Sequence, residues 1–187
     1  RDLKVKSEHI SSHILENEIL TTKKGLRFFN GHYDNLENKI GGEKNGSIMM
    51  DLTSQVIPII SNVSNKIMSA EVYEAIKKVL KDDGSPGIRL TSEFKEIDMN
   101  IGRITGFVYG YKEHGSKWVQ QNIMLAYGLY KQGLVTQGNE IMQEVYEIAN
   151  NTEKAQIFPG IPSYFNNQNK GAYAYLTGSS SWFLMTL

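Results

Sequence analysis

The sequence lacks cysteine, an excess of charge of either sign, and any long apolar run. Without cysteine, disulfide bonds and thiolate catalysis are excluded. Twenty basic side chains balance twenty acidic ones, so no overall field attracts nucleic acid or an anionic membrane surface. No apolar stretch reaches the roughly 18 residues that a bilayer-spanning helix needs. We therefore expect neither nucleic acid nor a membrane as a partner, and we expect a cytoplasmic location.

The composition is that of an ordinary globular protein, with 40% hydrophobic and 21% charged residues. A length of 187 residues predicts one domain with a substantial core. The sequence begins RDLKVK, without an initiator methionine or the apolar centre of a signal peptide, and it ends inside a segment with a helical pattern. We expect both ends to be cuts through a longer polypeptide, which makes residues 1–187 a single partial domain.

The fold is predicted to be mainly α. Apolar spacing, capping residues and buried character predict helices over 5–20, 49–63, 69–80, 118–132 and 136–150, with a last helix from about residue 179. Ser69 is the expected N-cap of the third helix. Pro58 is expected to kink the second. A connection of only three residues, 133–135, predicts that its two flanking helices form an antiparallel hairpin.

The connecting segments are long and rich in glycine and aromatic residues. Residues 25–40 are predicted to form a loop with a short hairpin, and residues 41–46 a flexible polar loop. The segment 87–115 places glycines among β-branched and aromatic residues, which predicts irregular, closely packed backbone around a site. Helical hairpins joined by such loops favour a layered or toroidal helical domain and disfavour a parallel sheet.

Two familiar site patterns are incomplete. His9 and His13 have the four-residue spacing of a zinc-binding helix, but no glutamate lies between them, and we expect both on the polar side of the first helix. Gly41 and Gly46 have the spacing of a phosphate-binding loop, but Ser47 follows where that loop requires lysine. Neither a metal site nor a nucleotide site is predicted.

Five carboxylates near glycines or aromatic rings are candidates for acid–base chemistry, each with a helix cap or an ion pair as the competing interpretation. They are Asp34, Asp51, Glu96, Asp98 and Glu113. Glu113 is the most informative because it follows Tyr109 and Tyr111 in a glycine-containing loop. Rings that stack on sugar faces beside a hydroxyl-binding carboxylate are typical of a carbohydrate site, although an ordinary aromatic core has the same composition.

The run Thr177-Gly178-Ser179 lies where the last helix is expected to begin. Backbone N–H groups at a helix start are unpaired, and the helix dipole adds partial positive charge there. Small hydroxylated residues leave room for an oxyanion at such a position. A plain N-cap, in which the hydroxyl groups only close the helix end, is the alternative interpretation.

Five motifs, taken together and in order, resemble the later half of the catalytic domain of the inverting glycoside phosphorylases of glycoside hydrolase family ninety-four. The motifs are 28–35 (FFNGHYDN), 50–56 (MDLTSQV), 106–113 (GFVYGYKE), 158–162 (FPGIP) and 175–182 (YLTGSSSW). The family includes cellobiose, chitobiose and β-1,2-oligoglucan phosphorylases and the phosphorylase-like module of cyclic β-1,2-glucan synthases. The sequence is more similar to the β-1,2-glucan type.

This resemblance implies that the chain is part of an (α/α)6 barrel. It also implies a reaction in which inorganic phosphate attacks the anomeric carbon of a β-linked glucose unit while an aspartic acid protonates the glycosidic oxygen. The product is α-glucose 1-phosphate, formed with inversion. The implied partners are a β-gluco-oligosaccharide, with β-1,2 linkage favoured, the rest of the parent polypeptide, and a homodimer as a candidate assembly. Phosphate is a co-substrate and no cofactor is implied.

The resemblance also assigns residues. Phosphate binding is assigned to Thr177, Gly178 and Gln120, and substrate binding to Glu113, with the aromatic residues Tyr109 and Tyr175 as further candidates. The family's general acid is expected upstream of this chain, so no catalytic residue is assigned here and the chain alone is expected to be inactive.

Two positions depart from the family pattern. His114 stands where an asparagine is usual, and Gln120 stands where a phosphate-binding histidine is usual. Glutamine can donate a hydrogen bond but carries no charge at any pH. This difference leaves a second function open: a degenerate, non-catalytic carbohydrate-binding helical domain. A purely structural helical domain, which would bind neither phosphate nor sugar, is a third.

Overall fold

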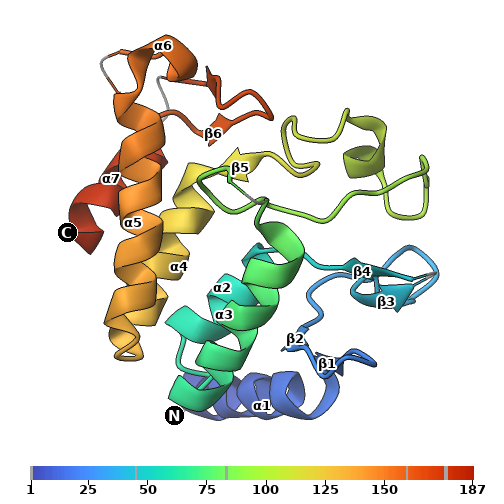
Figure 1. Cartoon of the computed structure of the whole chain (residues 1–187). Coiled ribbons are helices and arrows are strands. Elements are labelled where there is room, and N and C mark those ends of the chain that lie inside the picture. The colour runs from blue at the N-terminus through green and yellow to red at the C-terminus, as the bar shows by residue number, and fades with distance from the viewer. Residues whose placement is uncertain (1, 45, 83, 159, 175–176) are drawn as a thin grey trace.

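The computed structural model describes residues 2–44, 46–82, 84–158, 160–174 and 177–187. Within these ranges the protein is mostly helical, with seven α-helices and seven short strands (Figure 1). The helices are α1 (Asp2–Asn17), α2 (Thr53–Ile60), α3 (Lys66–Leu80), α4 (Val119–Lys131), α5 (Val135–Asn150), α6 (Thr152–Ala155) and α7 (Thr177–Thr186). Among the described residues, no helix combines the length and apolarity that a bilayer crossing requires.

The strands form three small antiparallel sheets. Strand β1 (Ile19–Thr21) pairs with β2 (Arg27–Phe29), and β3 (Gly42–Lys44) pairs with β4 (Ser47–Met49). The third sheet has the order β5 (Lys117–Trp118), β6 (Tyr164–Phe165), β7 (Gly171–Ala172). It joins the start of α4 to the segment that leads into α7. A single 3-10 turn, Arg103–Gly106, lies within the long loop between α3 and β5.

Helix α4 is the centre of the structure, because it packs against α2, α5 and α7. Its inward face is fully buried through Ile123, Leu125 and Leu129. A Cβ on Gly128 would lie 2.9 Å from Cγ2 of Ile59, so glycine at this position allows α2 to approach α4 closely. The core therefore lies between helices, as a layered helical domain requires.

Helices α2, α4 and α7 run in the same direction. Near the last turn of α4, Lys131 Nζ donates to the carbonyl of Ile60 at the end of α2, over 2.8 Å. Near the middle of α4, the ring of Tyr127 meets the ring of Trp182 of α7 edge to face, with 5.6 Å between centroids. At the other end, a Cβ on Gly178 in the first turn of α7 would lie 2.7 Å from Oε1 of Gln120 in the first turn of α4. The contacts thus join end to end and start to start, so the three N-termini lie at one end of the helix layer.

The predicted hairpin of helices 118–132 and 136–150 is confirmed as α4 and α5. The predicted first helix is confirmed but ends at Asn17, because the next residues pair with β2. None of its residues is buried. The predicted second helix begins at Thr53, because residues 47–49 form a strand with part of the segment expected to be a flexible loop. The last helix begins at Thr177, two residues earlier than predicted.

The prediction that Ser69 caps the third helix is wrong. Helix α3 begins at Lys66, and the side chain of Asn65 caps it by accepting a hydrogen bond from the N–H of Met68 at 3.0 Å. Ser69 lies fully buried within the first turn, where its hydroxyl shares a 2.9 Å hydrogen bond with that of Ser64. Asparagine and serine are both good N-caps, and the extended backbone at Asn65 decides between them.

Candidate functional site

The starts of α4 and α7 meet at one end of the helix layer. A Cβ on Gly178, the second residue of α7, would lie 2.7 Å from Oε1 of Gln120 in the first turn of α4. The absence of a side chain at Gly178 thus lets the Gln120 amide lie directly against the start of α7. Two of the residues predicted to bind phosphate are therefore adjacent, at a helix start that favours anions.

Two further residues were predicted in this region. Tyr175 and the side chain of Thr177 lie outside the described residues. Among the described residues the Gln120 amide nitrogen has one weak partner, the thioether of Met124, at 3.8 Å. The amide oxygen Oε1 is the atom nearest to Gly178, so the amide must rotate to present Nε2 to an anion bound between the two helix starts.

Trp118 connects the start of α4 to the loop that carries Glu113. Its ring stacks on that of Tyr164, with 5.7 Å between centroids, and its Nε1–H donates to the carbonyl of Lys112 at 2.9 Å. The backbone of Lys112 has a positive φ of 48°, so this turn is held by its contacts and not by a glycine. Trp118 thereby joins the meeting point of α4 and α7 to the loop of Glu113.

A cavity of about 350 Å³ lies beside this loop, on the side of α2. Small-molecule sites occupy about 300–1,000 Å³, so its size suits a small ligand or one unit of a larger one. Its wall combines apolar side chains with charged ones, notably Phe29, His32, Asp51, Phe94, Arg103 and Glu113. Neither Gln120 nor Gly178 is part of this wall, so the cavity is distinct from the meeting point of α4 and α7.

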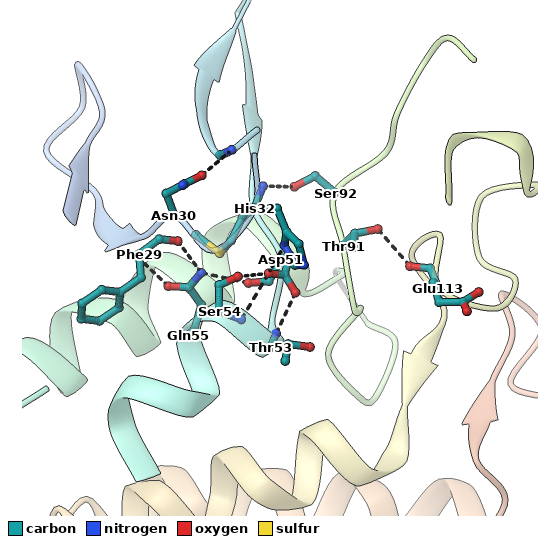
Figure 2. A network of polar contacts seen from close by, with 12 residues as sticks. Phe29, Asn30, His32, Asp51, Thr53, Ser54, Gln55, Thr91, Ser92 and Glu113 are labelled. Carbon is teal, nitrogen blue, oxygen red and sulfur yellow. Dashed lines mark hydrogen bonds and ion pairs between the residues drawn. The ribbon is translucent and has the colours of Figure 1, made fainter. Parts of the chain in front are cut away.

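Glu113 has one engaged and one unengaged carboxylate oxygen. Its Oε1 forms an ion pair with the guanidinium of Arg103. Its Oε2 is buried and has no hydrogen-bond partner among the described residues. Its backbone carbonyl accepts a 3.4 Å hydrogen bond from the hydroxyl of Thr91 (Figure 2). A buried carboxylate oxygen without a donor is costly, so this oxygen is suited to accept a hydrogen bond from a ligand hydroxyl.

Asp51 lies on the same cavity, at the start of α2. Its two carboxylate oxygens accept from the backbone N–H groups of Thr53, at 2.9 Å, and Ser54, at 3.2 Å. Oδ2 also lies 3.1 Å from Nδ1 of His32 and accepts from the Ser54 hydroxyl (Figure 2). Burial acts to raise the pKa of Asp51, but the hydrogen bonds from His32 and Ser54 outweigh it and lower the pKa. The carboxylate is therefore ionised at neutral pH.

Two residues bring the segment of His32 to the start of α2. A Cβ on Gly31 would lie 1.8 Å from the hydroxyl oxygen of Ser54, so only glycine permits this approach. Gln55 is fully buried; it accepts from the N–H of Phe29 at 2.8 Å and donates to the carbonyl of Phe29 at 2.9 Å. The side chain of Gln55 thus makes the two backbone hydrogen bonds that a neighbouring strand would otherwise make with the end of β2.

The sequence comparison agrees with this geometry. The profile of the catalytic domain of the glycosyl hydrolase 94 superfamily matches residues 2–187. The chain belongs to this superfamily. Its members are glycoside phosphorylases, which transfer glycosyl groups and have carbohydrate and phosphate as substrates. A comparison with curated proteins gives no match to the chain.

Tyr109, predicted as a sugar-binding ring, lies away from the cavity. The guanidinium of Arg89 lies 4.8 Å from the centre of its ring, and His114 meets it edge to face at 5.2 Å. A Cβ on Gly115 would lie 2.0 Å from the ring. Tyr109 does not line the cavity, so the structure gives it a packing role in the loop and does not bring it to Glu113.

Sequence reasoning did not identify His32 and Arg103 as site residues. His32 lies in a motif that resembles the family, but nothing in its spacing indicates a pairing with Asp51, 19 positions later. Arg103 lies ten positions before Glu113, at the start of a 3-10 turn within a long loop. The one available signal was the presence of both residues in glycine-rich segments, where loops carry functional groups.

Proposed function

We propose that this protein phosphorolyses β-linked gluco-oligosaccharides, β-1,2-linked ones first among them, and releases α-glucose 1-phosphate with inversion. The close approach of Gly178 and Gln120 carries the proposal, because it brings together two helix starts, whose N–H groups favour anions. Membership of a family of glycoside phosphorylases supports phosphate as that anion.

The chain is further proposed to form the later half of an (α/α)6 barrel. The parallel arrangement of α2, α4 and α7, and the antiparallel hairpin of α4 and α5, fit alternating inner and outer helices of such a barrel. In this arrangement the general acid belongs to a preceding part of the barrel. The chain then supplies phosphate and sugar contacts and needs the rest of the barrel for catalysis.

The residues of this chain have separate roles in the proposed reaction. The N–H groups at the start of α7 and the Gln120 amide hold phosphate oxygens, with the helix dipole as the source of positive potential. The free Oε2 of Glu113 accepts a hydrogen bond from a sugar hydroxyl. Because the amide is neutral, the strength of phosphate binding at Gln120 does not depend on the protonation of that side chain.

The test is a phosphorolysis assay of the polypeptide that carries this chain. Release of α-glucose 1-phosphate is followed from β-1,2-, β-1,3- and β-1,4-gluco-oligosaccharides, with and without inorganic phosphate. We expect product only with phosphate, and fastest from the β-1,2-linked substrates. Sugar binding without product from any substrate would contradict the proposal. It would favour the non-catalytic carbohydrate-binding domain, for which the neutral Gln120 is the motivating observation.

A further inference from the structure

The cavity beside Glu113 has a second polar wall that the proposed roles leave unused. This wall consists of His32, Asp51 and the first residues of α2. In Figure 2, Thr91 lies between Asp51 on one side and Glu113 on the other. A ligand bound to Glu113 within the cavity thus also faces the wall that contains His32.

The imidazole of His32 is oriented by its contacts. Its Nδ1 lies 3.1 Å from Oδ2 of Asp51, and that carboxylate is itself fixed by two backbone N–H groups. No partner of Nε2 is recorded among the described residues, and the side chain is 60% exposed. With Nδ1 bonded to a carboxylate, Nε2 is the nitrogen left to exchange a hydrogen bond with a ligand.

We infer that His32, oriented by Asp51, binds a hydroxyl group of the sugar that is displaced from the cleaved bond. The inference rests on the proposed function, because it takes the cavity ligand to be part of a glucan. Phosphate and the cleaved bond must lie together near Gln120 and Gly178. Since neither residue lines the cavity, the cavity receives the leaving side of the substrate.

The chemistry of the two walls suits a neutral sugar. Glu113 accepts hydrogen bonds only, whereas the Nε2 of His32 accepts when the ring is neutral and donates when it is protonated. Phe29 and Phe94 add apolar surface for the carbon face of a sugar ring. Each carboxylate already has a partner, Arg103 for Glu113 and His32 for Asp51, so the cavity does not require a charged ligand.

The test measures the KM for each of the two substrates of the reverse reaction. In synthesis from α-glucose 1-phosphate and a glucan acceptor, His32→Ala should raise the KM for the acceptor about three- to tenfold, the effect of one hydrogen bond, and leave the KM for the sugar phosphate unchanged. His32→Gln, which keeps an amide near the position of Nε2, should restore part of the acceptor affinity. The matched control is His9→Ala on the exposed face of α1, which should change neither constant.

The outcomes distinguish this inference from the proposed function. An unaltered protein without phosphate-dependent activity would contradict the proposed function and, with it, the inference. An active protein whose His32→Ala variant keeps the original acceptor KM would overturn the inference alone. Equal changes in both KM values would also overturn it, because they would mean that His32 acts on the fold of the loop and not on the acceptor.

Discussion

The two parts of the candidate site are built in different ways. The anion-binding part lies on regular structure, where Gln120 and Gly178 belong to the first turns of α4 and α7. The part proposed to bind sugar lies outside the α-helices, where Glu113 and His32 belong to loops and Arg103 begins a 3-10 turn. On the proposed function, phosphate binding depends on how two helices pack, whereas sugar binding depends on a few polar contacts between loops.

The largest effect is expected at Gln55, which joins the end of β2 to α2. Gln55→Leu removes hydrogen bonds to both backbone groups of Phe29 and to the carbonyl of Asp51, and leaves them buried without partners. We expect a loss of about 3 kcal/mol in the free energy of unfolding, measured by denaturant titration. Gln143→Leu, on the exposed side of α5, should change it by less than about 0.5 kcal/mol. Equal losses of unfolding free energy in both variants would show that the hydrogen bonds of Gln55 do not hold β2 to α2.

The sugar-binding part is tested by Glu113→Gln. The neutral amide loses the ion pair with Arg103 and presents a weaker acceptor to the sugar. Since a hydrogen bond to a charged group contributes about 1.5–3 kcal/mol, kcat/KM for the oligosaccharide should fall about ten- to a hundredfold. The KM for phosphate should not change, as steady-state kinetics with each substrate varied will show. A rise in the KM for phosphate alone would contradict the division of the site into two parts.

A smaller effect is expected at the meeting point of α4 and α7. In Gly178→Ala, the new Cβ would lie 2.7 Å from Oε1 of Gln120, and the flexible amide must move away. The KM for phosphate should rise about tenfold, equivalent to about 1.4 kcal/mol, with the KM for the sugar unchanged. Gly106→Ala is the matched control, because a Cβ there has no described atom within 4 Å. An unchanged KM for phosphate in Gly178→Ala would mean that the Gln120 amide does not bind phosphate.

The last effect depends on pH and concerns the sheet that joins the two parts. Burial, with the nearby Arg89 guanidinium, lowers the pKa of Lys117 to about 8, while its Nζ donates to Asn169 at 2.9 Å. The unfolded chain holds this proton up to its usual pKa near 10.5. Between about pH 8 and 10.5 the unfolded state thus binds more protons, and the stability of the folded state rises with pH by less than about 1.4 kcal/mol per unit.

Lys117→Met removes this titration. The difference in unfolding free energy between the variant and the unaltered protein should therefore shift in favour of the unaltered protein as the pH is raised from 8 to 9.5. Denaturant titrations at several pH values measure it, and the comparison of the two proteins cancels the other groups that titrate in this range. A difference that does not change with pH would mean that Lys117 has an ordinary pKa in the folded protein.

The sequence was sufficient for most of the helices, whereas the anion-binding helix start stays a prediction. Apolar spacing predicted the hairpin of α4 and α5, and a short run of small residues predicted an anion-binding helix start that includes Gly178. These features are local, because spacing and capping act within a few residues. The exceptions were also local: Asn65 competes with Ser69 as a cap of the same helix, and backbone geometry decides between them.

The loop contacts could not be predicted in the same way. The pair of His32 with Asp51 depends on Gly31, whose missing side chain lets one loop approach the start of α2. Tyr109 was expected in the sugar site but packs on Arg89, because composition does not show which face of an aromatic ring is already covered. Long-range contacts between irregular segments leave no period in the sequence, so no spacing rule identifies them.

The measurement that tests the central claim most directly is the phosphate dependence of phosphorolysis in Gln120→His and in the unaltered protein. An imidazole at the start of α4 adds a group that can carry positive charge beside the start of α7. We expect a lower KM for phosphate in the variant, by a larger factor at pH 6 than at pH 8, and the same KM for the oligosaccharide. Identical phosphate dependence in the two proteins at both pH values would contradict the claim that phosphate binds where α4 and α7 meet.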